Sequence, residues 1–182
     1  GKKVAKELSK QLDCEFESDN NKFYELASKS ALVNSHGSLK ALASDLYKIA
    51  NDIRFLSSGP RCGIGELIIP ANEPGSSIMP GKVNPTQVES MTMVTIQVMA
   101  NDFAITMANS QGQLQLNAYM PLIIYNMDQS INLLAKSLKC FRENLLVGLK
   151  ANKLKIKENL DNSLMLVTSL SPYIGYDKAS KI

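Results

Sequence analysis

Apolar residues recur at helical spacing along most of the chain, with one long interruption in the middle. Residues 2–12 have a helical pattern, and a polar connector follows at 13–21. A long helix is predicted next, because its apolar positions alternate steps of three and four: Leu39, Leu42, Leu46, Ile49, Ile53 and Leu56. It ends at the strong helix breaker Ser57-Ser58-Gly59-Pro60.

Two more long helices are predicted beyond the interruption. Residues 85–108 are apolar nearly all round, which indicates burial on several sides. In a chain this short, we expect other subunits to supply part of that cover. The next helix runs from about Pro121 to Gly148 and keeps the three-four rhythm of a long bundle helix through these positions: Ile124, Met127, Ile131, Leu134, Leu138, Phe141 and Leu145.

The tail from Ala151 has helical stretches that are broken at Ser171-Pro172 and at Gly175. We therefore predict an all-α fold in two parts. Residues 1–150 form part of a bundle of long helices, and residues 151–182 begin a small C-terminal domain. Because the pattern of a new helix starts where the sequence stops, we interpret the chain as an internal fragment of a longer protein.

The interruption, residues 59–84, is rich in residues that break regular structure. It holds five of the ten glycines and four of the seven prolines. A structureless loop of this length inside a compact domain is uncommon and is usually functional. It runs into a helix start, with Asn84 as the predicted N-cap, Pro85 at the first helical position and Gln87 three residues after the cap.

Three side chains near the end of this loop suggest chemistry on a carboxylate. Lys82 lies just outside the predicted helix N-terminus, where backbone N–H groups also point at anions. The hydroxyls of Ser76 and Ser77 lie just upstream. Such a site can hold a carboxylate and offer an oxygen base to a neighbouring proton.

Composition excludes several classes of function. The net charge is only +3, aromatic residues make up 6% and there is no Trp, which argues against nucleic-acid binding. No apolar run reaches the roughly 18–20 residues that a membrane helix needs. Three widely spaced Cys without a CxxC motif and a single His predict no metal site, and reduced thiols in a cytosol or matrix.

The loop 75–85 reads Gly-Ser-Ser-Ile-Met-Pro-Gly-Lys-Val-Asn-Pro. It resembles the signature of the fumarase/aspartase superfamily, Gly-Ser-Ser-x-Met-Pro-x-Lys-x-Asn-Pro, at every fixed position. Flanking segments look like the class II fumarate hydratase branch: Asn72-Glu73-Pro74, Gly59-Pro60-Arg61, Gly63-Ile64-Gly65-Glu66, Ser163-Leu164-Met165-Leu166-Val167-Thr168 and Ile174-Gly175-Tyr176-Asp177-Lys178-Ala179. The resemblance runs over essentially the whole chain, whereas members of the family are much longer.

The resemblance implies a fold, a reaction and an assembly. The fold would be the central helical domain of the superfamily, and the reaction the reversible hydration of fumarate to (S)-malate in the tricarboxylic acid cycle. Neither a metal, an iron–sulfur cluster nor an organic cofactor is expected. The protein would be a homotetramer whose active sites each draw on three subunits, in the cytoplasm or, in a eukaryote, the mitochondrial matrix.

The resemblance also implies roles for individual residues. Ser76 would be the catalytic base, while Ser77, Lys82, Asn84 and the backbone of Val83 would hold the dicarboxylate. Glu89 would support a catalytic histidine that comes from another segment; the alternative is a charge that merely favours the helix N-terminus.

His36 is expected to be a packed or surface histidine. The family's proton-donating histidine belongs to a Thr-His motif that this chain lacks. For that reason we expect that the 182 residues do not turn over fumarate by themselves.

Two other functions stay open. The segment Gln111-Gly112-Gln113-Leu114-Gln115-Leu116-Asn117 looks more like the aspartase form of this turn, so aspartate ammonia-lyase or another lyase of the superfamily is one alternative. A non-catalytic, oligomeric helical scaffold is the other.

Overall fold

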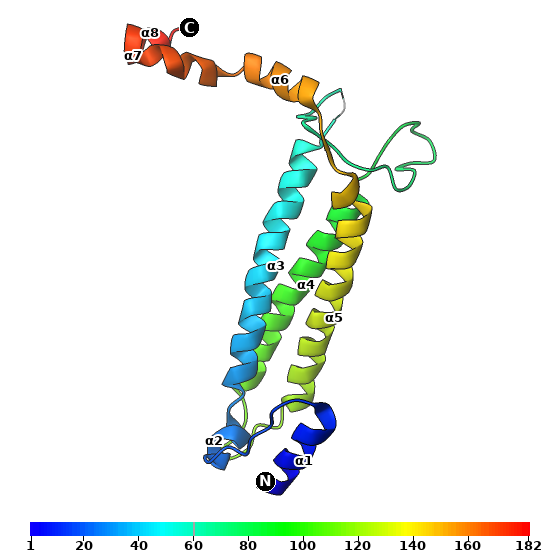
Figure 1. Cartoon of the computed structure of the whole chain (residues 1–182), viewed down its shortest axis with the longest axis vertical. Helices are drawn as coiled ribbons and strands as arrows, with labels where there is room; N and C mark the ends of the chain where they lie inside the picture. The colour runs from blue at the N-terminus through cyan, green and yellow to red at the C-terminus, as the bar shows by residue number, and fades with distance from the viewer. Residues whose placement is uncertain (60) are drawn as a thin grey trace. The chain divides into compact units, whose positions relative to one another are not determined.

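Helices dominate the computed structural model, which describes residues 1–59 and 61–182. Pro60, part of the predicted helix breaker, lies outside the described residues. The elements are α1 (Lys2–Leu12), α2 (Lys22–Ala27), α3 (Ser30–Leu56), β1 (Leu67–Ile68), α4 (Thr86–Asn109), α5 (Met120–Asn144), the 3₁₀ turn η1 (Leu146–Gly148), β2 (Lys150–Ala151), α6 (Lys153–Asp161), the 3₁₀ segment η2 (Leu164–Leu170), α7 (Ser171–Ile174) and α8 (Tyr176–Ala179) (Figure 1). The all-α prediction is confirmed.

The chain divides into two compact units. Unit 1 comprises residues 1–41 and 98–131, and unit 2 comprises residues 42–97 and 132–182. The long helices α3, α4 and α5 each contribute residues to both units. Within each unit these three helices pack side by side, with α4 antiparallel to the other two (Figure 1).

Each unit has its own apolar core, built from one face of each long helix. In unit 1 the buried core residues are Ile105, Ala108, Ile123 and Met127, and α3 packs Leu32, Val33 and Leu39 against them. In unit 2 they are Ala50, Ile53, Val88, Met91, Phe141 and Leu145. Burial of these side chains is the main force that holds the three helices together.

A buried polar network also joins the three helices of unit 1. His36 on α3 is fully buried, so of the two predicted environments, packed or surface, it has the packed one. Its Nδ1 lies 3.1 Å from Asp102 Oδ1 on α4, and its Nε2 lies 2.8 Å from Ser130 Oγ on α5. Lys40 Nζ donates to Asp102 Oδ2 at 2.6 Å, and Asn101 Nδ2 donates to Ser130 Oγ at 3.0 Å.

The network places a hydrogen on Nδ1 of His36. An ionised Asp102 can only accept, so His36 Nδ1 must be the donor in that bond. Ser130 Oγ already accepts from Asn101, and its hydroxyl hydrogen can point at His36 Nε2. Nδ1 of His36 therefore carries a hydrogen, and every member of the network has a partner.

Asp102 is expected to make stability depend on pH. Burial raises its pKa, but hydrogen bonds and charge from Lys40 and His36 outweigh burial and lower the pKa below its usual value. Its stabilising effect is thus complete above the unfolded-state pKa of about 4 and is lost as pH falls through the lower folded-state pKa. We expect Asp102→Asn to lower the free energy of unfolding at pH 7 by about 1–3 kcal/mol.

Denaturant unfolding across the acid range, from neutral pH downward, measures this difference. It should shrink as the pH falls below about 4, where the native carboxylate is being neutralised. Asp52→Asn is the matched control, because Asp52 is exposed and pairs with the exposed Lys48 one turn away, so its change should stay within about 0.5 kcal/mol. If Asp102→Asn lowered the free energy of unfolding by the same amount at every pH, the stabilising role of the ionised Asp102 carboxylate would be contradicted.

The helix predicted after the connector is interrupted near its start. Instead of one helix, α2 ends at Ala27, Ser28 is extended (φ −94°, ψ 142°), and α3 begins at Ser30. The N–H group of Lys29 donates to Asn109 Oδ1 at 2.6 Å, a partner 80 residues further along. This tertiary hydrogen bond gives a partner to the Lys29 N–H group, which lies in the break between the two helices.

The central loop is also more ordered than predicted. Its residues Leu67 and Ile68 form β1 and pair antiparallel with Ala151 and Lys150 of β2. In the tail, η2 ends at Leu170 and α7 begins at Ser171, so a boundary lies at Ser171-Pro172 as predicted, and Gly175 separates α7 from α8 at a φ of 82°. Proline is compatible with the first turn of a helix because the N–H groups there have no partner inside the helix.

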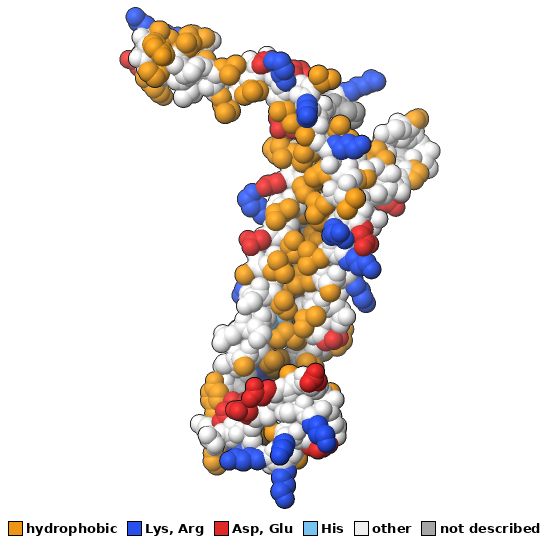
Figure 2. Space-filling model, in the orientation of Figure 1, with side chains coloured by type: hydrophobic (Ala, Val, Ile, Leu, Met, Phe, Trp, Pro, Cys, Tyr) orange, Lys and Arg blue, Asp and Glu red, His pale blue; other side chains and the backbone are white. Residues whose placement is uncertain are grey.

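Many apolar positions of the long helices face outward. On α5 the predicted stripe is only half buried, because Ile124, Ile131 and Leu138 are exposed. On α4 the exposed apolar residues repeat every three or four positions: Met93, Ile96, Ala100, Phe103 and Met107. Hydrophobic side chains accordingly cover much of the helix surface in Figure 2. Among the described residues, no helix combines the length and apolarity needed to cross a membrane.

Candidate functional site

The loop between Gly75 and Lys82 closes on itself in unit 2. The N–H group of Gly75 donates to the carbonyl oxygen of Lys82 at 2.9 Å, and the N–H group of Lys82 donates to that of Met79 at 3.3 Å. Asn84 Nδ2 donates to the carbonyl oxygen of Gly75 at 3.1 Å. These bonds hold the two ends of the loop together and display residues 76–81 from a fixed base.

The two glycines of the loop are needed for different reasons. A Cβ on Gly75 would lie 2.6 Å from the carbonyl oxygen of Lys82 and 3.0 Å from the backbone nitrogen of Asn84, so any side chain would force the loop ends apart. Gly81 has open space around it but a φ of 75°, which side-chain-bearing residues rarely adopt.

The hydroxyl oxygen of Ser76 receives two backbone donors. The N–H groups of Ile78 and Met79 both lie 3.2 Å from Ser76 Oγ. Convergent N–H dipoles stabilise negative charge on the oxygen that they face. The loop therefore provides Ser76, the residue predicted as base, with local support for an anionic oxygen.

Ser76 and Lys82 line the same hollow. Its volume is about 440 Å³, and its walls are Ala71, Asn72, Glu73, Pro74, Ser76, Met79, Pro80, Gly81, Lys82 and Val83. A neighbouring hollow of about 560 Å³ shares residues 80–83 and adds Ser57, Gly59, Gly65, Leu67, Ile68, Ile69 and Asn152. Lys82 and Val83 thus border both hollows, whereas Ser77 is exposed and lies outside them.

The charge of Lys82 is available for a ligand. The side chain is exposed, and within residues 1–59 and 61–182 no carboxylate lies at ion-pair distance from its ammonium group. Glu73, a second lining residue of the smaller hollow, is also exposed. An exposed cation on the rim of a hollow attracts small anions.

Asn84 does not cap α4 as predicted. The helix begins at Thr86, and its first backbone bond runs from the N–H group of Glu89 to the carbonyl oxygen of Pro85. The amide of Asn84 instead donates back to Gly75, and Gln87 Oε1 accepts from the thiol of Cys140 at 3.2 Å. The Asn84 side chain, which a capping box would place at the start of α4, closes the Gly75 loop instead.

Glu89 lies in the first turn of α4 and has a partner that the sequence did not indicate. Its Oε1 is 3.8 Å from Arg54 Nη2 at the end of α3, and both side chains are about half exposed. An ion pair this exposed contributes little to stability. No spacing rule links residues 54 and 89, so only the packing of α3 against α4 in unit 2 reveals the pair.

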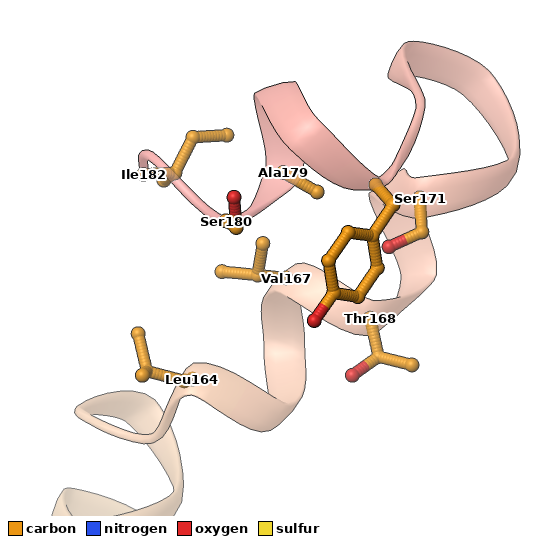
Figure 3. A pocket seen from close by; sticks show the side chains of 8 residues that line it. Leu164, Val167, Thr168, Ser171, Ala179, Ser180 and Ile182 are labelled. Carbon is orange, nitrogen blue, oxygen red and sulfur yellow. The ribbon is translucent and has the colours of Figure 1, made fainter.

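Another hollow lies among the last residues of the chain, away from the predicted site residues. It measures about 280 Å³ and is lined by Leu164, Val167, Thr168, Ser171, Tyr176, Ala179, Ser180 and Ile182 (Figure 3). Its lining is apolar apart from hydroxyl groups and carries no charged side chain. Among the residues that the structure describes, no group of three His, Cys, Asp or Glu side chains could hold a metal ion.

A comparison with protein families decides the classification of the chain. A family model described as a lyase matches residues 1–100, more than half of the sequence. The chain belongs to this lyase family.

Curated relatives and solved structures give more specific matches than the family model does. The class II fumarate hydratase of Listeria monocytogenes serotype 4b (strain F2365) is 59% identical over 182 residues, which is 100% of this chain and 40% of the relative. A recombinant class II fumarase from Schistosoma mansoni superposes with a TM-score of 0.88 at 46% identity, covering 98% of this chain and 39% of that one. A protein titled fumarate lyase:delta crystallin from Brucella melitensis gives a TM-score of 0.92 at 43% identity, covering 98% and 41%.

These similarities cover nearly all of this chain but only part of each relative. The chain spans about two fifths of the length of the curated fumarate hydratases that it matches. They confirm the resemblance to class II fumarate hydratases and the helical fold of the lyase family.

Proposed function

We propose that the full-length gene product catalyses the reversible hydration of fumarate to (S)-malate. The observation that carries this proposal is the Ser76 oxygen, which accepts two backbone N–H groups in a closed loop and shares a hollow with Lys82. The high identity to proteins named class II fumarate hydratase supports the same substrate pair.

The chemistry explains why this arrangement suits the reaction. Dehydration of malate begins when a base removes a proton from the carbon next to a carboxylate, a very weak carbon acid. The proton leaves only if the resulting doubly negative carboxylate is stabilised where it forms. In our proposal Ser76 takes this proton, and Lys82, Ser77, Asn84 and the backbone of Val83 hold the dicarboxylate.

The leaving hydroxide needs an acid on the opposite side of the substrate. His36 cannot supply it, because it is fully buried in unit 1 and both ring nitrogens are hydrogen-bonded. The chain has no other histidine. We propose that a histidine outside these 182 residues donates this proton and that Glu89 supports it.

The product of the reaction distinguishes the proposal from its rivals. Ultraviolet absorbance of fumarate is followed with the full-length gene product, first with malate and then with aspartate. Fumarate from malate alone supports the hydratase. Fumarate from aspartate would favour an ammonia-lyase and the aspartase-like interpretation of the Gln111–Asn117 turn, and none from either would favour a scaffold.

We further propose that the outward apolar faces of the long helices pack against other copies of the chain in a homotetramer. Met93 and Phe103 on α4 are 65% and 69% exposed, and the stripe to which they belong has the three-four spacing of helix-packing surfaces. Exposed apolar faces of this extent mark interaction sites in soluble proteins. We also propose that the active sites are shared between subunits and that the protein is located in the cytoplasm or, in a eukaryote, in the mitochondrial matrix. Residue 150 would separate the central bundle domain from a C-terminal domain.

A charge on this stripe is expected to break the assembly. Phe103→Lys should convert the tetramer into dimers or monomers, because an ammonium group in a dry helix interface is costly to desolvate. Light scattering coupled to size exclusion measures the change. Ser44→Lys, at an exposed polar position of α3, is the control and should remain tetrameric; a tetramer that survives Phe103→Lys would refute this interface.

A further inference from the structure

Two segments of unit 2 that are far apart in the sequence are joined by an antiparallel ladder. Its centre is the β1–β2 pair, in which Leu67 faces Ala151 and Ile68 faces Lys150. The ladder continues past β2, because the N–H group of Asn152 donates to the carbonyl oxygen of Glu66 at 2.8 Å.

The ladder also continues in the other direction, toward the Gly75 loop. Gly148 lies against the ring of Pro70, so close that a Cβ there would be 2.5 Å from Pro70 Cγ. Asn72 Nδ2 then donates to the carbonyl oxygen of Asn144, the last residue of α5, at 2.9 Å. Residues 64–72 are thus held along their length by residues 144–159, and the Gly75 loop follows three residues later.

Side-chain amides hold the far end of this ladder. Asn152 Nδ2 donates to the carbonyl oxygen of Gly65 at 3.0 Å. Asn159 Nδ2 lies 3.3 Å from the carbonyl oxygen of Ile64 and 3.0 Å from Glu66 Oε1. Two strands of two residues each would leave these carbonyl groups unpaired, and the amides satisfy them.

Glu66 connects the ladder to the bundle. Its N–H group donates to the carbonyl oxygen of Leu56 at the end of α3, while its carbonyl oxygen and its carboxylate are held by Asn152 and Asn159. The ladder also reaches the candidate site, because Gly65 and Asn152 line the same hollow as Lys82 and Val83.

We propose that Asn152 and Asn159 are positioning residues for the Gly75–Lys82 loop. They touch residues 64–66 and act through the ladder, which sets where the loop leaves the bundle and hence where Ser76 and Lys82 lie. The expected effect on kcat rests on the proposed function. The expected effect on the position of the loop rests only on the contacts of the ladder.

Two variants of the full-length gene product test this role. Asn152→Ser keeps a side-chain oxygen that can accept from the N–H group of Lys155 and cap α6, but it shortens the side chain and removes the amide that reaches Gly65. Asn159→Ala removes both of that residue's bonds to residues 64 and 66. The matched control is Asn162→Ala, because Asn162 Nδ2 donates to the carbonyl oxygen of Glu158 within α6.

Hydrogen exchange is read at the amides of Gly75 and Lys82, which close the loop. We expect both amides to exchange about tenfold faster in Asn152→Ser and Asn159→Ala and at the wild-type rate in Asn162→Ala. We expect kcat for malate to fall about tenfold to a hundredfold in the first two variants, since small misplacements of catalytic groups are costly. Melting temperatures of all three should agree within a few degrees.

The readouts separate failure of this inference from failure of the proposed function. Exchange at Gly75 and Lys82 that stays at the wild-type rate in both variants would overturn the inference. So would faster exchange with an unchanged kcat in an active enzyme. If the wild-type protein makes no fumarate, the proposed function fails, and the exchange rates still decide whether the ladder positions the loop.

Discussion

Replacing Ser76 with alanine is expected to lower kcat for malate dehydration by about 10²–10⁴-fold, the range typical for the loss of a positioned general base. The two N–H groups that face Ser76 Oγ would lose their acceptor, and the substrate proton would have no base. Because Lys82 still lines the hollow, KM should change little. Steady-state kinetics of the full-length gene product give both constants.

Ser77→Ala is the matched comparison for this prediction. Ser77 is the adjacent exposed hydroxyl, which we propose binds substrate without taking the proton. Its loss should raise KM more than it lowers kcat, since it removes a contact made in the ground state as well as the transition state. A Ser76→Ala enzyme that keeps more than a tenth of wild-type kcat would contradict the role of Ser76.

Gly75→Ala is expected to cost about 10²-fold in kcat/KM without removing any functional group. The new methyl group would collide with the carbonyl oxygen of Lys82 and the backbone nitrogen of Asn84, and both belong to the rigid base of the loop. The loop must open, which moves Ser76 and Lys82 relative to each other. The measurement is kcat/KM for malate, together with the melting temperature.

Gly37→Ala controls for the general effect of replacing a glycine. Gly37 lies inside α3, where an added methyl group would meet none of the described residues within 4 Å. This substitution should raise the free energy of unfolding by about 0.4–1 kcal/mol and leave kcat/KM unchanged. If Gly75→Ala retained kcat/KM within about threefold of wild type, the closed loop would not be the catalytic conformation.

Local sequence patterns predict most of the helices, because a helix that is buried on one face has apolar residues at every third or fourth position. Residues 2–12 are helical as predicted, and α4 and α5 lie within a few residues of their expected bounds. The break between α2 and α3 escapes such patterns because its hydrogen bond pairs Lys29 with Asn109. A contact between residues so far apart in the sequence leaves no local periodicity.

The same limit explains the errors in the central loop. The β1–β2 pair joins Leu67 to Ala151 and Ile68 to Lys150, residues that are distant in the sequence. Each strand has only two residues, too few for an alternating pattern to be recognised. About half of the α5 stripe faces outward. The spacing of apolar residues could not predict this, because it does not say which other segment of the protein buries each residue.

The candidate site was predicted as a set of residues but not as a geometry. The motif predicts Ser76, Lys82 and Val83, and the structure brings them to the edge of one hollow. It could not indicate that Asn84 folds back on Gly75 or that Glu89 pairs with Arg54. These contacts depend on the closure of the loop and on the packing of α3 against α4.

The most direct test of the proposed role of Ser76 is the exchange of the methylene protons of malate with heavy water, followed by nuclear magnetic resonance. We predict that the full-length gene product exchanges one of the two protons, that Ser77→Ala retains this exchange, and that Ser76→Ala loses it. Exchange at the wild-type rate in Ser76→Ala would show that another group removes the proton and would contradict the central role of this serine.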